Sequence, residues 1–266
     1  MNSTTRVRVR RDRPTAVALA VALCVTMLVV YVLTLDLKRP DVVQSMAAAP
    51  RVTREIRLEP LEGWCVAMAR CDSREEARLK ASAWVNRGAA GYVAESEDGG
   101  WMVYGALYDS QREAERIAGR LNDAEDIPAE VVPVAAEGLT LRVTAPEAQI
   151  AAIAQGDALL RRQRGQLGDI ALQIDRNEIT ADAARTLCAL AATEAAEAAA
   201  MLSAIPGAAE NGLCAGLIER LNSLAQLQKA AADTAPATGA TLSGMLRCAR
   251  IDSFMGHWAW QRGIAG

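Results

Sequence analysis

Histidine and recognisable catalytic motifs are what this 266-residue chain most clearly lacks. Its one histidine, His257, lies between Gly256 and Trp258 without the residue spacing of a metal site. The sequence contains no HExxH zinc motif, no GxSxG nucleophile motif and no glycine-rich phosphate loop. Glu194 and Glu197 lie one helical turn apart in an alanine-rich stretch, where a solvent-exposed helix face is the ordinary explanation. We therefore expect no enzyme activity, no catalytic residue, no metal site and no cofactor.

An excess of positive charge is also absent. The formal net charge is −3 at pH 7. Residues 64–134 contain 8 basic and 13 acidic side chains, which gives −5. A nucleic-acid partner needs a basic surface that displaces counterions from phosphates, so the charge argues against nucleic acid as a partner. A neutral sugar ligand is not excluded by this charge.

Closely spaced cysteine pairs are missing as well. The six cysteines include no CxxC metal spacing. Cys65 and Cys71 would lie about 20 Å apart in a continuous strand, beyond the reach of a disulfide. Three further cysteines fall in separate helical stretches: Cys188, Cys214 and Cys248. Either all three are small core residues, or two of them form one disulfide. We predict mostly free, buried thiols.

The N-terminus combines a basic tail with a long uncharged run. Residues 1–13 hold five arginines and one aspartate, and residues 15–35 hold no charge. Twenty-one residues span about 31 Å as a helix, close to the thickness of a bilayer core. A cleaved signal peptide is the alternative, with alanines 47–49 as the cleavage site. We favour an uncleaved transmembrane helix with the arginine-rich side in the cytoplasm.

The most informative feature present is an internal repeat between residues 64 and 134. Val66, Ala69, Asp72-Ser73 and Glu76-Ala77 recur at an offset of 37 as Val103, Ala106, Asp109-Ser110 and Glu113-Ala114. Each copy runs from a short apolar strand to an Asp-Ser helix start, an amphipathic helix and a second strand. Because one copy cannot bury its helix alone, we expect the two copies to pack together.

The repeat predicts a four-stranded antiparallel sheet. Strands are expected near residues 64–69, 92–94, 101–108 and 129–134. Helices are expected to start at Asp72 or Ser73 and at Asp109 or Ser110. The order is βαββαβ, and both helices cover one face of the sheet. Trp64, Trp84 and Trp101 are expected to be core residues.

This arrangement resembles the SPOR domain, the sporulation-related repeat of bacterial envelope proteins. The family motif corresponds to Val66-Ala67-Met68-Ala69-Arg70-Cys71 and, in the second copy, to Val103-Tyr104-Gly105-Ala106-Leu107-Tyr108. The resemblance covers about 70 residues. Ala67 replaces the frequent glutamine of the family, Ala69 the glycine and Cys71 the first aromatic. The resemblance implies a ferredoxin/RNP-like fold and binding to peptidoglycan, typically denuded glycan strands, linked to cell division or sporulation.

If glycan binds, the sheet face opposite the two helices is the expected place. Strand alternation puts these residues on that face: Cys65, Ala67, Tyr92, Met102, Tyr104, Glu130 and Val132. Ala67, Tyr92, Met102 and Tyr104 are the candidate glycan-binding residues, because tyrosine rings stack on sugars while the hydroxyl forms hydrogen bonds. The alternative is that the tyrosines cover the sheet or contact the C-terminal region. Ala67 cannot form the hydrogen bonds of a glutamine amide, and this favours the loss of glycan binding.

The C-terminal half predicts a helical bundle. Apolar residues recur at helical spacing in about 150–174, 187–202, 213–227 and from 242 onward. Trp258 and Trp260 near the end either dock a partner or, as we favour, pack on the bundle. The predicted fold class is thus α+β, with an N-terminal transmembrane helix, a βαββαβ SPOR-like domain and an all-α bundle.

These patterns divide the chain into six segments. Residues 1–14 are a cytoplasmic basic tail, 15–35 the transmembrane helix, 36–60 a linker, 61–136 the SPOR-like domain, 137–145 a connector strand and 146–266 the bundle. The resemblance and the anchor together predict a single-pass protein of the bacterial cytoplasmic membrane with exocytoplasmic C-terminal domains. It would bind peptidoglycan or, alternatively, act as a non-enzymatic envelope scaffold through a protein partner of the bundle.

Overall fold

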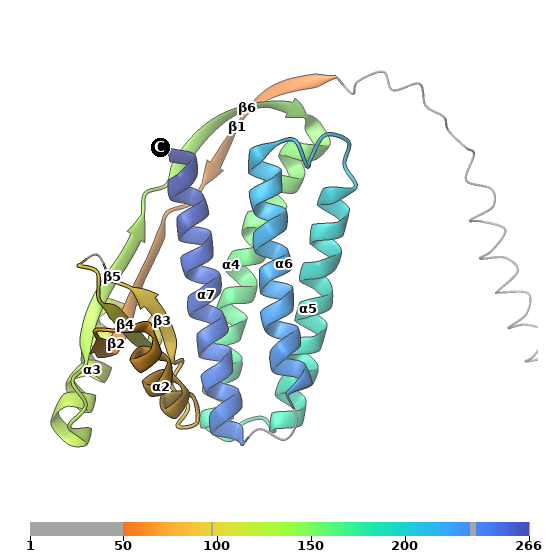
Figure 1. Ribbon diagram of the computed structural model, residues 1–266. Helices are drawn as coiled ribbons and strands as arrows, with labels where there is room; N and C mark the ends of the chain where they lie inside the picture. The colour runs from red at the N-terminus through yellow and green to blue at the C-terminus, as the bar shows by residue number, and fades with distance from the viewer. Residues whose placement is uncertain (1–49, 97, 235–237, 266) are drawn as a thin grey trace, which may run out of the picture. The chain divides into compact units, whose positions relative to one another are not determined.

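The computed structural model describes residues 50–96, 98–234 and 238–265, and Figure 1 shows how their elements are arranged. In this part of the chain there are six strands and six helices: β1 (Arg51–Leu58), β2 (Leu61–Cys71), α2 (Arg74–Val85), β3 (Tyr92–Glu95), β4 (Trp101–Tyr108), α3 (Gln111–Glu125), β5 (Glu130–Ala136), β6 (Leu139–Pro146), α4 (Glu147–Asp175), α5 (Ala181–Ser203), α6 (Gly212–Asp233) and α7 (Gly239–Ala265).

The repeat forms a four-stranded antiparallel sheet with the order β3-β4-β2-β5. Between Leu61 and Ala136 the elements follow the order βαββαβ. Ser73 caps α2 by accepting a hydrogen bond from the backbone of Glu76 at 3.2 Å, which satisfies one free amide of the first turn. The two repeat copies therefore start their helices at equivalent Asp-Ser pairs.

Helices α2 and α3 cover one face of this sheet. Their alanines allow close approach to strand residues, and the two clusters contain Val66, Met68, Ala114 and Ala118 under α3, and Ala77, Ala81 and Val103 under α2. Trp64, Trp84 and Trp101 are half-buried residues packed against these clusters. Burial on this face thus comes from residues within the repeat itself.

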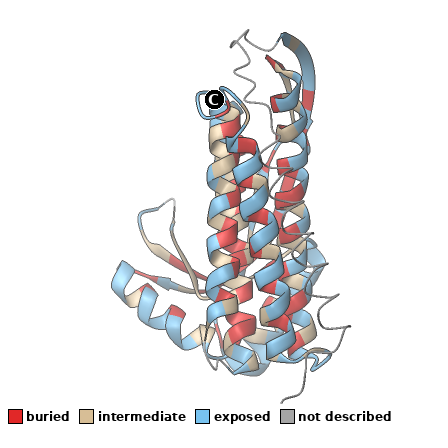
Figure 2. Cartoon of the chain, turned by 90° about the vertical axis from the view of Figure 1, so that its right-hand side faces the viewer, coloured by how far each residue is buried: buried red, intermediate tan, exposed pale blue. Residues whose placement is uncertain are grey.

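Helices α4 to α7 form a four-helix bundle, and Figure 2 shows buried positions recurring along each helix where it faces the others. Its core consists largely of leucines and isoleucines, among them Ile153, Leu160, Leu167, Leu217, Leu221, Leu224, Leu242 and Leu246. Thr180 and Asn211 cap α5 and α6 by accepting hydrogen bonds from Ala183 and Leu213. Trp260 packs against this core, as expected from the sequence.

Helix α7 also packs against the second face of the sheet. Ile251 and Phe254 are buried together with Leu61, Met102 and Leu107. Gly244 permits α7 to approach the end of α2 as well, because a Cβ atom there would lie 2.6 Å from the carbonyl oxygen of Val85. The sheet therefore lies between two helices on one side and the bundle on the other, as Figure 1 shows for β2–β5 and α7.

The predicted linker 36–60 needs a correction. Its last part forms β1, which pairs antiparallel with β6, from Arg51 opposite Pro146 to Leu58 opposite Leu139. Alternate residues of β1, Ile56 and Leu58, are buried in the same core as α4, which explains why this polar stretch is a strand. The expected connector strand 137–145 corresponds to β6, which begins at Leu139 and ends at Pro146, so the structure has a second, two-stranded sheet.

The prediction of a transmembrane helix and a single-pass membrane location is also corrected. Residues 15–35 lie outside the described residues. Within the described ranges, no helix is both long and apolar enough to cross a membrane. The longest one, α4, has charged side chains at its centre, including Arg161, Arg162 and Arg164, which would be costly in a bilayer.

The five cysteines in the described part of the chain are unpaired. Cys65, Cys71, Cys188 and Cys214 are buried, and Cys248 is half-buried. The prediction of mostly free, buried thiols is confirmed for these residues.

Candidate functional site

The four predicted glycan-binding residues occupy neighbouring positions on the sheet. Tyr92 pairs with Tyr104, Tyr104 with Ala67, and Ala67 with Glu130, so one row crosses all four strands. Met102 lies two residues before Tyr104 on β4 and on the same face. The repeat thus brings the candidates together as the alternation predicts.

This face is not exposed to solvent, and its tyrosines contact the C-terminal region, as the alternative interpretation predicts. Only 2% of Ala67, 4% of Met102 and 7% of Tyr104 is exposed, because Ile251 and Phe254 of α7 cover the row. Tyr92 is half-buried at one end of the row. An extended glycan strand lying flat across the sheet would collide with α7.

Polar contacts hold α7 on the sheet at one end. Trp258 donates its indole N–H to the carbonyl of Ala135 at 2.8 Å. The Gln261 amide donates to the carbonyls of Glu59 at 3.1 Å and Glu137 at 2.8 Å. Glu59 and Glu137 lie where β1 passes into β2 and where β5 passes into β6, and Ala135 lies near the end of β5. The contacts of Gln261 therefore satisfy backbone carbonyls of the two connections.

A second set of contacts holds the helix near α2 and α3. Arg250 forms an ion pair with Asp109 at 2.6 Å. Arg247 donates to the carbonyl of Gly88 at 2.5 Å and forms an ion pair with Asp175 of α4. Helix α7 is thus fixed on the sheet at several points along its length.

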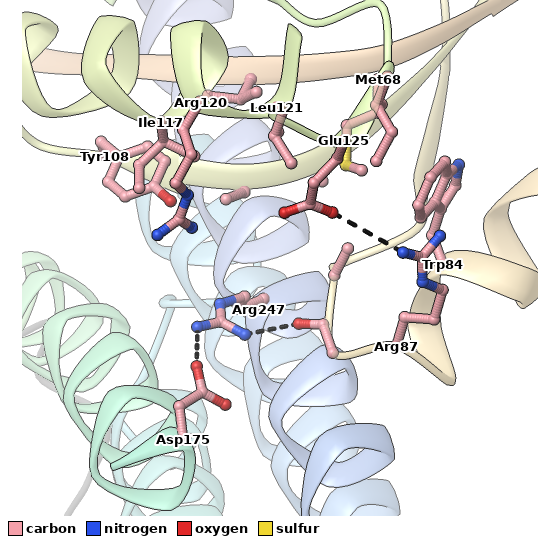
Figure 3. Close-up of a pocket in the computed structure, with 16 residues that line it drawn as sticks. Met68, Trp84, Arg87, Tyr108, Ile117, Arg120, Leu121, Glu125, Asp175 and Arg247 are labelled. Carbon is pink, nitrogen blue, oxygen red and sulfur yellow. Dashed lines mark hydrogen bonds and ion pairs between the residues drawn. The ribbon is translucent and has the colours of Figure 1, made fainter. Parts of the chain in front are cut away.

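Figure 3 shows the pocket around Arg247, a cavity of about 240 Å³ between the repeat helices and the bundle. Two of its arginines are paired: Arg247 lies between Asp175 and the Gly88 carbonyl, and Arg87 faces Glu125 at 3.7 Å. The guanidinium of Arg87 also lies 4.8 Å from the centre of the Trp84 ring. These contacts join the loop after α2 to α3, and α4 to α7, around the pocket.

A larger cleft, which we call the sheet cleft, lies beside α7 over the other part of the sheet. It has a volume of about 910 Å³. Its lining includes Tyr92, Met102, Tyr104 and Glu130 from the sheet and Asp252 and Trp258 from α7. Three of the four predicted residues therefore line one concave site, whereas Ala67 lies outside its lining.

Two tyrosines form the aromatic surface on the sheet side of the cleft. The ring centres of Tyr92 and Tyr104 are 6.4 Å apart, and the ring planes are tilted by 38°. Burial raises the pKa of Tyr92 to about 12, and the nearby Asp252 carboxylate adds to the rise. Burial also raises the pKa of Tyr104. Both hydroxyls are therefore protonated at neutral pH and can donate hydrogen bonds.

The bundle supplies the main polar group of the sheet cleft. Burial raises the pKa of Asp252, and the charge of Arg220 opposes this effect. The guanidinium of Arg220 forms its ion pair with Glu219, so it does not neutralise Asp252 directly. Arg70 and Asp98 close the opposite wall with an ion pair of 2.6 Å. The cleft thus offers an aromatic surface next to a partly desolvated carboxylate.

His257 lies apart from the sheet cleft, inside the contact between α4 and α7. Its side chain is fully buried, with Nε2 2.8 Å from a carboxylate oxygen of Asp157 and Nδ1 3.4 Å from Arg164. Burial lowers the pKa of His257, although Asp157 opposes this effect. Through these contacts His257 joins α7 to α4.

Asp252 is the residue of the site that sequence reasoning missed. It follows Ile251 and precedes Phe254 by two residues, so it lies at the margin of the apolar stripe that contacts the sheet. A carboxylate beside such a stripe is the only sign of Asp252 in the sequence. It indicates a site only when α7 is known to contact the sheet.

Together these features define a class of protein: a βαββαβ sheet enclosed by its own two helices and a four-helix bundle, with a ligand-sized cleft beside the covering helix. No known family, curated protein or solved structure matches this chain in the comparisons made. The function is therefore inferred from the site.

Proposed function

We propose that this chain is a non-enzymatic binding protein that holds peptidoglycan glycan in the sheet cleft. The observation that carries the proposal is the meeting of Tyr92, Met102 and Tyr104 with Asp252 in one cleft of about 910 Å³. Small-molecule sites commonly have volumes of about 300–1,000 Å³, and this cleft falls within that range. The resemblance of the repeat to SPOR domains supplies the ligand class.

The chemistry of the lining suits a sugar. An aromatic face contacts the apolar side of a pyranose ring, and carboxylates accept hydrogen bonds from its hydroxyls. Tyr92 from β3 and Asp252 from α7 offer both groups in the lining of the cleft. Helix α7 leaves room for a short glycan segment or a chain end, which would enter beside it. The resemblance of the repeat to SPOR domains implies denuded glycan as the preferred form.

Sedimentation of the full chain with peptidoglycan sacculi, intact and amidase-treated, tests the proposal. We expect enrichment on the amidase-treated material. Tyr92→Ala should weaken binding about 10-fold through lost stacking. Asp252→Asn keeps the shape and should weaken binding about 5-fold, because hydrogen bonds to charged groups are stronger. Leu79→Ala, at an exposed position of α2, is the matched control. Absence of binding to either preparation would refute the proposal.

The burial of the predicted glycan face favours a second candidate, a scaffold that acts through the bundle. Here α7 occupies the face that a glycan would use, and Ala67 is 2% exposed. In this case the sheet serves as a support for the bundle, and glycan binding has been lost. The same sedimentation separates the two functions, because a scaffold would not sediment with sacculi.

A further inference from the structure

The bundle carries an exposed apolar stripe on α5, on the side of the bundle formed with α4. Contiguous exposed apolar side chains are uncommon on a protein surface and usually mark an interaction site. Leu190 is 65% exposed and Met201 is 68% exposed. With Leu187 they recur at spacings of three and eleven residues, and Glu194 and Glu197 fall between them. Residues at these spacings share one face of a helix.

This stripe borders a groove between α4 and α5, which we call the α4–α5 groove. It contains two hollows of about 690 and 530 Å³ that share Glu194. The first is lined by Ala152, Leu159 and Met201, and the second by Ile170, Leu187 and Leu190. The lining of the groove extends on α4 from Ala148 to Gln173, which is about 37 Å of helix.

The shape and the backbone chemistry of the groove select a helix as its occupant. Both walls are α-helices, whose backbone amides are bonded within the helix, so an extended peptide could not add to them as a strand. A long apolar groove of this kind usually binds an amphipathic helix, whose apolar contact residues repeat at i, i+3, i+4 and i+7. A partner helix of about 18 residues, or about 27 Å, would reach both hollows.

The charged residues of the groove determine which sign of charge the partner helix should carry. Its charged lining residues are Arg162, Asp169, Glu194 and Glu197. Arg162 is already paired with Glu194, which also accepts a hydrogen bond from Gln163 at 2.8 Å. Asp169 and Glu197 therefore leave an acidic excess. A second copy of α5 would bring its own Glu194 and Glu197 against these groups, so self-pairing is disfavoured.

We propose that the α4–α5 groove binds an amphipathic helix of another protein that carries basic residues beside its apolar stripe. The proposal rests on the scaffold candidate and is independent of glycan binding, so a failure of the sacculus experiment leaves it intact. The apolar anchors fill the two hollows, and the basic residues face Glu197 and Asp169. The contact is thus both hydrophobic and salt-dependent.

Two designed 18-residue helical peptides with the same apolar stripe test this proposal, one with lysines and one with glutamates beside the stripe. Fluorescence anisotropy with the full chain should show at least 10-fold tighter binding of the lysine peptide at low salt. Leu190→Ser should weaken that binding about 10-fold, and Glu197→Lys should shift the preference toward the glutamate peptide. Leu79→Ser on α2, at 68% exposure, is the matched control and should bind like the wild type.

Equal binding of both peptides to the wild-type chain would overturn the proposal, as would binding that Leu190→Ser leaves unchanged. Analytical ultracentrifugation of the chain without peptide tests the other occupant. A dimer that becomes a monomer in Leu190→Ser would assign the groove to a second copy and would also overturn it. A monomer at the concentrations of the binding experiment is the expected result.

Discussion

The two faces of the four-stranded sheet are covered by helices from different parts of the chain. On one face, α2 and α3 belong to the same repeat as the strands and pack on Val66, Met68 and Val103. On the other, α7 begins about 100 residues after the last strand of this sheet and covers Ala67 and Tyr104. The first face is specified by local sequence, whereas the second depends on a contact that is distant in the chain.

The covered face of this sheet differs from an open sheet face that binds a ligand. A sheet that binds ligand on an open face needs polar groups there to remain soluble. Here that face presents Leu61, Cys65, Met102 and Leu107, which are all at most 4% exposed. The proposed ligand site is therefore the sheet cleft beside α7 and not the centre of this face.

The largest expected loss of stability comes from removing the central contact of the sheet face that α7 covers, which we call the bundle-side face. Phe254→Ala should lower the free energy of unfolding by about 3–5 kcal/mol, because the ring is 1% exposed and leaves a cavity. Urea denaturation of the full-length variant measures this loss. Leu79→Ala, on the exposed side of α2, should change stability by less than about 0.5 kcal/mol. Similar small losses in both variants would mean that α7 does not pack on the sheet.

A smaller loss of stability should follow when one methyl group is added between α7 and the end of α2. Gly244→Ala places a Cβ atom 2.6 Å from the Val85 carbonyl oxygen and 2.7 Å from that of Ala89. We expect a loss of about 1–3 kcal/mol and faster hydrogen exchange in β4. Gly263→Ala, in the same helix, meets nothing within 4 Å. It should be neutral or slightly stabilising, because alanine favours helix more than glycine. If both variants behaved alike, the close approach at Gly244 would be disproved.

The smallest effect concerns pH and the buried His257. Burial lowers its pKa in the folded state below the ordinary value of 6.5. The unfolded chain therefore binds the proton first, and stability should fall as the pH decreases below about 6.5. Asp157 has a lowered pKa, so its own contribution is lost only as the pH falls toward and below 3.8. Unfolding free energies between pH 5 and 7.5 should decline less steeply in His257→Gln. An equal slope in both proteins would exclude this histidine as the cause.

Much of the fold follows from local pattern. The Asp-Ser pairs, the strand alternation and the helical stripes predict the βαββαβ order and the positions of the bundle helices, since each depends on neighbouring residues. Strand β1 was missed because it pairs with β6, about 90 residues later, and reads as a polar linker when taken alone. Its alternate Ile56 and Leu58 were the only local signal.

The site was predicted in part. Strand alternation placed Tyr92, Met102 and Tyr104 on one face, and they do line one cleft. The burial of that face results from its contact with α7, for which the apolar character of Cys65, Ala67 and Met102 is the local signal. Asp252 could not be assigned without the contact between α7 and the sheet, which arises only in the folded chain.

The central claim, that α7 covers the sheet face expected to bind glycan, can be tested by native-state alkylation of two cysteines. Cys65 lies on the bundle-side face and is 0% exposed, and its pKa is raised by burial to about 12. Cys71, on the same strand, belongs to the cluster under α2 and is 3% exposed. Pulse alkylation of the full chain, read by peptide mass spectrometry, should find both thiols protected until the protein unfolds. Rapid alkylation of Cys65 with continued protection of Cys71 would show that the face is open and would contradict the account.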